Sequence, residues 1–321
     1  MEPSPGVAVL LIILDILAPI FLVIALGWLL TRSGFLSSQA LVQVNRLAYW
    51  VALPALLVHR IAQASPDVDA VAGLLLVGGG ATVLAILVAL VVAALMGMPP
   101  QSRGTFAQGV YRGNLTFIGL PIILYAFAGP DMSSASAEAS ALLAFGPMVV
   151  LYNVLAVLVL LLPGGTGHGN ALRDAVRGLL TNPILIACLI GLMMSLSGLS
   201  FPTLADRSLE VVGQMALPLA LLCIGGTLHT SRIRGRLAWV ITGAVMKVSV
   251  VPAIGFLLAL WLGLSAEHTR IALILLACPT ATASYILVKQ LQGDEALASG
   301  IVVVSNLLAV PAMVVVLAVT A

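Results

Sequence analysis

Charged residues are scarce in this sequence. Of its 321 residues only 8% are Asp, Glu, Lys or Arg, whereas charged residues make up about 25% of an average soluble domain. Hydrophobic residues account for 61%, and the mean hydropathy is +1.17. The net charge of +2 argues against nucleic acid or another strong polyanion as a partner. The composition indicates an integral membrane protein whose surroundings are the lipid bilayer.

The signatures of metal, cofactor and enzyme sites are also missing. The cysteines, Cys188, Cys223 and Cys278, lie in apolar runs without C-x-x-C spacing and are expected to be buried. None of the four histidines pairs with Cys, Asp or Glu at metal-ligand spacing. The sequence contains no G-x-S-x-G, H-E-x-x-H or P-loop motif. We therefore predict no enzyme activity, no metal and no cofactor.

Long apolar runs fill most of the chain. A transmembrane helix needs roughly 20 apolar residues, and this length predicts ten spans joined by short connectors. They cover about residues 8–31, 40–61, 70–97, 105–128, 135–162, 180–198, 205–229, 237–263, 269–291 and 296–320. The N-terminus lacks the basic segment of a signal peptide, so the first span is expected to remain in place. We expect an all-α integral membrane protein.

The connectors differ in charge on the two sides of the membrane. Counted alternately, eight basic residues lie on one side: Arg32, Arg103, Arg173, Arg177, Arg232, Arg234, Arg236 and Lys289. Three lie on the other, Arg60, Arg207 and Arg270, together with most of the acidic residues. Since basic connectors stay in the cytoplasm, both termini are predicted on the non-cytoplasmic side.

The two halves of the chain resemble each other at an offset of 164 residues. This offset relates Pro19 to Pro183, Gly27 to Gly191, Gly34 to Gly198, Pro54 to Pro218 and Pro147 to Pro311. Residues 1–163 and 164–321 would each hold five spans, an odd number, so the second half enters the membrane inverted. Inverted repeats are typical of secondary transporters, which bind substrate near the midplane.

Spans four and nine contain helix breakers near their centres. Span four holds Asn114, Gly119 and Pro121, and we expect two half-helices to meet near residues 118–121. Span nine holds Pro279, followed by four polar side chains: Thr280, Thr282, Ser284 and Tyr285. Breaks in the hydrocarbon are tolerated where they face protein or water, and half-helix N-termini attract anions. A simple proline kink is the alternative at each break.

Lys247 is a charged residue deep within span eight, and no Asp or Glu lies comparably deep. Such a lysine usually faces protein or a wet cavity and is functional, although snorkelling to an interface is the alternative. We expect it to attract an anionic substrate or to replace a coupling ion. Arg112 could add charge or anchor the interface. Asn153 and Asn306, in spans five and ten, are further candidates for the site, but asparagines in spans also join helices.

The motifs in these spans are similar to those of the auxin efflux carrier family, in its bacterial branch within the bile/arsenite/riboflavin transporter superfamily. The matching stretches are "GNLTFIGLPI" (113–122), "NPILIACLIGL" (182–192), "LPLALLCIGGTL" (217–228) and "CPTATASYILVKQLQGD" (278–294). The resemblance implies a fold like that of the sodium–bile-acid symporters, in which spans four and nine cross at their prolines. It implies a scaffold of spans 1, 2, 6 and 7 and a moving transport domain of spans 3–5 and 8–10.

The resemblance also implies a substrate class, because bacterial relatives carry small organic acids and plant relatives export auxin. We therefore expect a secondary carrier of a small carboxylate anion in the bacterial inner membrane, working by elevator-like alternating access. A passive channel is the alternative, although no continuous polar stripe favours it. A buried lysine that releases and rebinds a proton would make transport pH-sensitive and independent of sodium. A homodimer is a further expectation.

Overall fold

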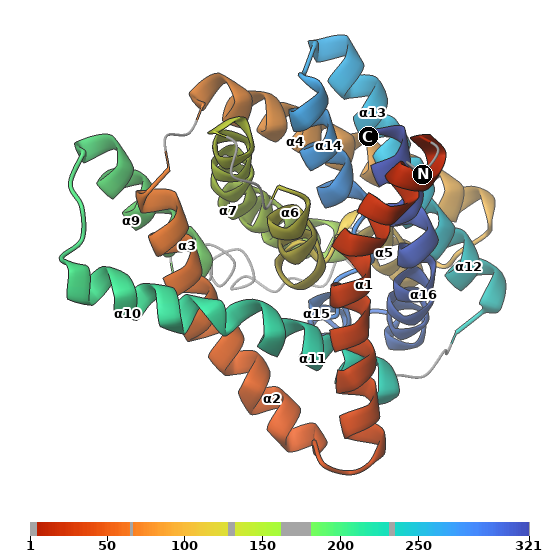
Figure 1. Cartoon of the computed structure of the whole chain (residues 1–321). Coiled ribbons are helices and arrows are strands. Elements are labelled where there is room, and N and C mark those ends of the chain that lie inside the picture. The colour runs from red at the N-terminus through yellow and green to blue at the C-terminus, as the bar shows by residue number, and fades with distance from the viewer. Residues whose placement is uncertain (1–4, 65–66, 128–131, 162–180, 231–234, 321) are drawn as a thin grey trace. The chain divides into compact units, whose positions relative to one another are not determined.

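The computed structural model describes residues 5–64, 67–127, 132–161, 181–230 and 235–320 (Figure 1). The elements within these ranges are all helices, as the sequence predicts, and no strand is assigned there. Seven helical stretches in the described ranges are long and apolar enough to cross a membrane. Several basic connector residues used for the predicted orientation, Arg173, Arg177, Arg232 and Arg234, lie outside the described residues.

The chain divides into two compact units. Unit 1 comprises residues 1–72, 120–147 and 180–230. Its helices are α1 (Pro5–Arg32), α2 (Ser38–Leu47), η1 (Ala48–Ala52), α3 (Leu53–Ala62), α6 (Leu120–Ala126), the first half of α7 (Met132–Leu161), α9 (Pro183–Ser197), α10 (Thr203–Gln214) and α11 (Ala216–Thr230).

Unit 2 comprises residues 73–119, 148–179 and 231–321. Its helices are most of α4 (Val68–Leu95), α5 (Pro100–Tyr111), η2 (Leu115–Gly119), the second half of α7, α12 (Leu237–Val245), η3 (Met246–Val250), α13 (Val251–Leu262), α14 (Ala266–Ala277), α15 (Ala283–Gln290) and α16 (Glu295–Val319). Each unit combines segments that are far apart in sequence, whereas each predicted repeat is one continuous segment. The predicted repeat boundary at residue 163 therefore stays untested.

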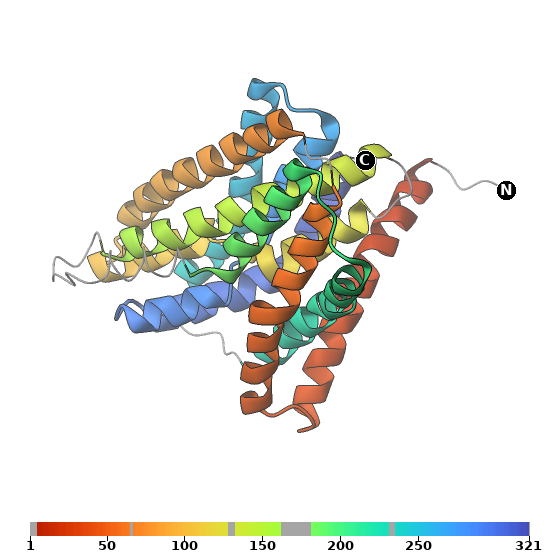
Figure 2. The ribbon, with the colours of Figure 1, turned by 90° about the vertical axis from the view of Figure 1, so that its left-hand side faces the viewer.

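Three of the ten predicted spans are shorter or interrupted helices. Span six is α9, with 15 residues. Span four is divided among α5, η2 and α6, and span nine between α14 and α15. By contrast α4 runs for 28 residues without interruption, as the long helix in orange-brown in Figure 2. The count of ten spans therefore stays a prediction.

The three π-helices of the described chain each precede a proline. η1, η2 and η3 end two residues before Pro54, Pro121 and Pro252 respectively. A proline cannot donate a hydrogen bond to the carbonyl four residues earlier, and its ring crowds that carbonyl. That carbonyl belongs in each case to the middle residue of the π-helix, where the wider turn makes room for it. The prolines thus loosen these helices without ending them.

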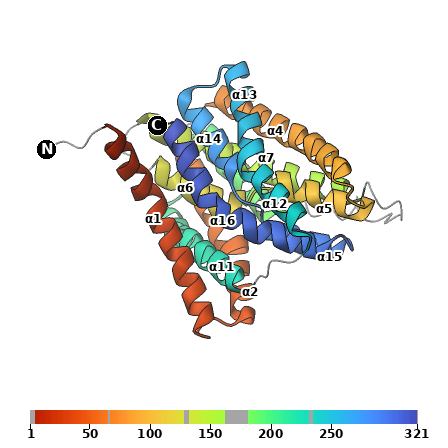
Figure 3. The same cartoon turned by 90° about the vertical axis from the view of Figure 1, so that its right-hand side faces the viewer.

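Glycines bring the helices of unit 1 together. An added methyl group at Gly27 of α1 would overlap the carbonyl oxygen of Leu222 in α11, and Figure 3 shows these helices side by side. At Gly191 of α9 it would lie 2.8 Å from Ile61 Cβ and 3.3 Å from the Val58 carbonyl oxygen in α3. Small residues permit such close approach between membrane helices. Both contacts pair residues that the 164-residue offset relates, since 27 + 164 is 191 and 58 + 164 is 222.

Helices α5, α12 and α16 pack together in unit 2. A methyl group at Gly243 of α12 would lie 2.9 Å from Ile301 Cδ1 and 3.1 Å from the ring of Phe106. One at Gly109 of α5 would lie 2.8 Å from the same Ile301 atom. Figure 3 shows α12 and α16 as neighbours. This packing holds the end of α5 firmly beside the first half of α16.

Candidate functional site

The two interrupted spans of unit 2 meet through their backbones. Helix α5 ends at Tyr111, and residues 112–114 are not helical. Asn114 N donates to the Pro279 carbonyl oxygen at 2.7 Å, and Ala281 N donates to the Arg112 carbonyl oxygen at 2.9 Å. Gly113 and Thr280 thereby form an antiparallel pair. We call residues 112–114 and 279–281 the backbone bridge, because each segment satisfies peptide groups that the interrupted helices leave without partners.

Side chains fasten the backbone bridge to the surrounding helices. The hydroxyl of the fully buried Thr280 donates to the Gly109 carbonyl oxygen of α5 at 2.6 Å. Thr280 N donates to the hydroxyl oxygen of Ser305 in α16 at 3.0 Å. A methyl group at Gly119 would lie 2.9 Å from Cys278 Sγ, so this glycine permits close contact between η2 and the second segment.

The position of the first break differs from the prediction. The sequence places it near residues 118–121, but the helix is interrupted at residues 112–114 and continues through Leu120 and Pro121. The π-helix η2 accommodates Pro121, so the helical run continues from η2 into α6 at this proline. The helix is interrupted instead at Gly113, where residues 279–281 form hydrogen bonds with the peptide groups on either side. The second break does lie at Pro279, between the end of α14 at Ala277 and the start of α15 at Ala283.

Lys247 reaches the backbone bridge from η3. Its side chain is fully buried, and Nζ donates to the Leu276 carbonyl oxygen at 2.7 Å. A methyl group at Gly113 would lie 3.3 Å from Nζ. The ammonium group thus lies at the C-terminal end of α14, where the helix dipole favours a cation. No ion pair between Lys247 and an acidic residue is formed within the described ranges, so its positive charge is left to the helix end.

Arg112 is a second cation, and it is part of the backbone bridge. Arg112 is only 7% exposed, and its Nη2 donates to Asn153 Oδ1 in α7 at 2.5 Å. The preceding residue, Tyr111, donates its hydroxyl to the Tyr152 carbonyl oxygen at 3.3 Å. These contacts hold the guanidinium beside α7 at the level of the bridge. Arg112 thus belongs to the backbone bridge and directs its guanidinium to α7, whereas the Lys247 ammonium lies beside Gly113.

Asn114 caps the helix that follows the first break. Its side-chain Oδ1 accepts a hydrogen bond from Phe117 N at 3.2 Å, in the manner of a helix N-cap. Its carbonyl oxygen accepts from Ile118 N and Gly119 N at 3.1 and 3.2 Å. The side chain therefore occupies the N-terminus of η2, where the sequence predicts open N–H donors. At the start of α15, by contrast, the N-cap Thr282 makes no side-chain hydrogen bond.

The remaining predicted site residues are spread more widely. Asn306 donates to the Val302 carbonyl oxygen within α16 at 2.7 Å. Tyr285 Oη lies 3.2 Å from Glu295 Oε2, at the start of α16. Ser284, in the first turn of α15, is buried, and its hydroxyl finds no hydrogen-bond partner in the described chain. Pro121 is buried in α6 and belongs to unit 1. The binding roles of all these residues stay predictions.

Sequence reasoning missed three residues of this region. Gly113 lacks a side chain and so leaves room for the Lys247 ammonium. The sequence pattern that could have indicated it is a glycine between two polar residues within a span. Ser305 accepts from the backbone bridge and lies next to the predicted Asn306. Gln108 is fully buried in α5, and neither end of its amide has a hydrogen-bond partner in the part of the chain that the structure describes. A lone Gln one turn before Arg112 was the available signal.

Helices of membrane-spanning length and a buried, positively charged interruption define a polytopic membrane protein with the features of a transporter. The comparison with known families supports this class. A model of the membrane transport protein family matches residues 12–170 and 168–317. The chain therefore belongs to this family, which is that of the auxin efflux carriers, and is an integral membrane transporter. No single curated protein gives a match.

Proposed function

We propose that the protein is a secondary active carrier of a small carboxylate anion in the bacterial inner membrane. The observation that supports this most is the buried Lys247 ammonium beside Gly113 of the backbone bridge, with no carboxylate bonded to it in the described chain. Arg112, a second buried cation, belongs to the same bridge. A buried cation without an acidic partner, as Lys247 is in the described ranges, favours an anionic ligand. A carboxylate there would gain charge-assisted hydrogen bonds that are stronger than those to neutral donors.

The residues would divide the work by their exposure. Arg112 and Asn114 flank Gly113 and would donate to the carboxylate directly, with Asn153 orienting the guanidinium. Lys247 is fully buried, and its ammonium group is bonded to the Leu276 carbonyl oxygen. It would therefore attract the anion electrostatically without touching it. The Ser284 hydroxyl would supply a further donor. Each contact lies in unit 2, as expected if this unit carries the substrate.

The contacts within unit 1 support the inverted repeat. The Gly27–Leu222 and Gly191–Val58 contacts are related by the same offset in sequence, as a two-fold relation between repeats would produce. We propose ten spans in two inverted repeats of five, with both termini outside the cytoplasm and alternating access by an elevator-like movement of one unit. A homodimer is proposed as the working assembly.

We also propose that the Lys247 ammonium couples transport to protons. The ionisable group that faces it is the Cys278 thiol. Uptake of the anion should then vary with pH and proceed without sodium. Lys247→Ala should give a flat pH profile, and Lys247→Arg should behave as permanently charged. A sodium requirement in the wild type, or an unchanged profile in Lys247→Ala, would rule out this coupling while leaving the carrier intact.

The alternative function is a passive pore for small solutes. Proteoliposomes loaded with a candidate acid such as malonate distinguish the two. A carrier shows saturation and faster uptake of labelled acid when unlabelled acid waits on the opposite side, whereas a pore shows neither. A thermal-shift screen of carboxylates on the purified protein would first select the acid. Non-saturating flux of every acid that binds would overturn the carrier proposal.

A further inference from the structure

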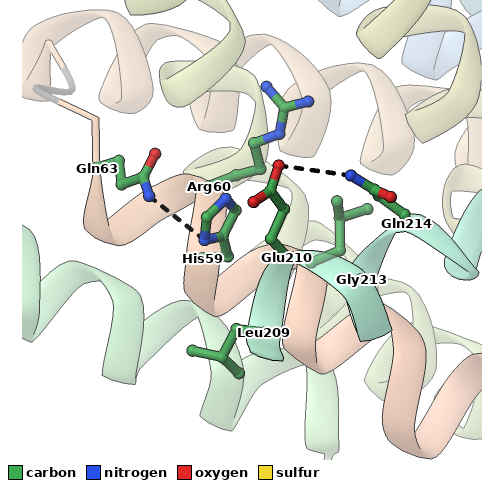
Figure 4. Close-up of a pocket in the computed structure, with 8 residues that line it drawn as sticks. His59, Arg60, Gln63, Leu209, Glu210, Gly213 and Gln214 are labelled. Carbon is green, nitrogen blue, oxygen red and sulfur yellow. Dashed lines mark hydrogen bonds between the residues drawn. The ribbon is translucent and has the colours of Figure 1, made fainter. Parts of the chain in front are cut away.

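Unit 1 contains a cavity of about 240 Å³ between α3 and α10, which we call the α3–α10 cavity. Five polar side chains line it: His59, Arg60, Gln63, Glu210 and Gln214 (Figure 4). Leu56, Leu209 and Gly213 supply apolar walls. A small molecule or the head of a larger one would fit this volume, but a drug-sized ligand, which needs about 300 Å³ or more, would not.

The hydrogen bonds around Asp206 fix which atoms are left for a ligand. His59 Nδ1 lies 2.9 Å from Asp206 Oδ1, so the ring nitrogen donates its proton to the carboxylate. Gln63 Nε2 donates to both oxygens of Asp206, at 3.0 and 3.2 Å. The dashed contact of 3.4 Å between Gln63 and His59 in Figure 4 thus joins two groups that both serve Asp206. With its amide nitrogen engaged, Gln63 keeps Oε1 as an acceptor.

Some charged groups at the cavity are in ion pairs, and Glu210 is in none within the described chain. Arg60 Nη1 pairs with Glu138 Oε1 at 3.4 Å, and Asp206 is bonded as above. Glu210 receives only the amide of Gln214, at 3.4 Å, and pairs with no cation among the residues that the structure describes. Figure 4 shows the Glu210 carboxylate between Arg60 and Gln214. Donating its N–H to Glu210 leaves Gln214 with a further acceptor, its Oε1.

This inventory selects the ligand. Arg60, the one cation among the lining residues, is paired with Glu138. The atoms left beside this pair include the Glu210 carboxylate and the amide oxygens of Gln63 and Gln214, all acceptors, so a cation with several N–H donors fits them. A metal ion prefers three or more His, Cys, Asp or Glu ligands, and no such group occurs in the described ranges. A primary ammonium carries one positive charge and three N–H donors, as a lysine does. We propose that the α3–α10 cavity binds a primary ammonium group, either of a soluble amine or of a phosphatidylethanolamine headgroup.

The proposal is tested on the purified full chain by thermal shift with ethylammonium. Saturable stabilisation is expected, and tetramethylammonium at equal ionic strength should give none, because it has the charge but no N–H donors. Glu210→Gln keeps the shape of the side chain and should weaken the apparent affinity by about threefold to fivefold, in keeping with one exposed charge pair. The matched control is Glu267→Gln, an exposed glutamate of unit 2, which should bind as the wild type does.

A second measurement separates the two sources. Protein in liposomes of equal phosphatidylethanolamine and phosphatidylcholine is released into native mass spectrometry. Preferential retention of phosphatidylethanolamine that Glu210→Gln abolishes identifies the lipid, and ethylammonium binding without such retention identifies a soluble amine. Gln63→Leu, which removes one acceptor without touching charge, should weaken whichever is bound. Equal shifts with tetramethylammonium, unchanged binding in Glu210→Gln, or binding of neither source would overturn the proposal.

Discussion

The two interrupted spans of unit 2 reach the same bridge by different means. In the first, the helix ends at Tyr111, well before its proline, and Asn114 caps the helix that follows. In the second, the helix ends directly before Pro279, and the N-cap Thr282 makes no side-chain hydrogen bond. In the first span, the Asn114 side chain caps the helix that follows the break. In the second span, no side chain in the described ranges caps the helix that follows the break.

This difference assigns separate tasks to the two breaks. The first supplies the polar and charged side chains Arg112 and Asn114, fixed by contacts to α7 and η2. The second supplies mainly backbone and hydroxyl groups, held by Thr280 against α5 and by Ser305 of α16. Charge selection is therefore expected to depend on the first break, and the stability of the bridge on the second.

Asn114 gives the largest expected effect on this division. Asn114→Asp keeps an oxygen that caps Phe117 but adds a negative charge where the anion would bind, and like charges in contact cost several kcal/mol. Uptake should fall by about 100-fold or more with little change in melting temperature. Asn114→Ala should raise the apparent KM and also destabilise the protein, because the cap costs about 1 kcal/mol.

Proteoliposome uptake and thermal unfolding at equal expression measure both effects. Normal uptake by Asn114→Asp would show that Asn114 does not contact the anion. It would also contradict the assignment of charge selection to the first break.

Where the two breaks touch, Gly119 and Cys278 should be coupled. Gly119→Ala places a methyl group 2.9 Å from Cys278 Sγ, and such overpacking costs about 1–3 kcal/mol. Cys278→Ala removes the sulfur and should restore the melting temperature of Gly119→Ala. The control is Gly79→Ala in α4, where the added methyl meets Leu151 at an ordinary 3.6 Å. Additive losses in the double variant would show that the breaks do not touch here.

The sequence predicted the second break better than the first for a physical reason. Pro279 interrupts α14 directly, so a rule based on proline finds it. Pro121 follows a π-helix that accommodates it. The actual interruption depends on two hydrogen bonds with residues far away in sequence, one accepted by the Pro279 carbonyl oxygen and one donated by Ala281 N. Span composition and the family motifs predicted the helical membrane fold and the family correctly. The direction of Tyr285 toward Glu295 depends on tertiary packing, which no local pattern contains.

The second break should owe its stability to Thr280 more than to Thr282. Thr280→Val keeps the shape but loses the 2.6 Å bond to the Gly109 carbonyl oxygen, which leaves a buried acceptor unpaired. A loss of about 1 kcal/mol is expected. Thr282→Val is the matched control, because no side-chain hydrogen bond is lost there, and it should change stability by less than about 0.5 kcal/mol. Equal melting temperatures for the two variants would contradict the assignment.

The least perturbing test asks whether the two breaks are inverted in the membrane. Under the predicted orientation, α5 begins in the cytoplasm and α14 begins outside, so corresponding half-helices face opposite ways. Gln101→Cys and Ala266→Cys lie in the first turns of these helices at exposed positions, and the three native cysteines are buried. An impermeant maleimide applied to intact cells should label Ala266→Cys and spare Gln101→Cys until the membrane is opened. Labelling of both from outside would refute the inversion, and the reverse pattern would place the termini in the cytoplasm.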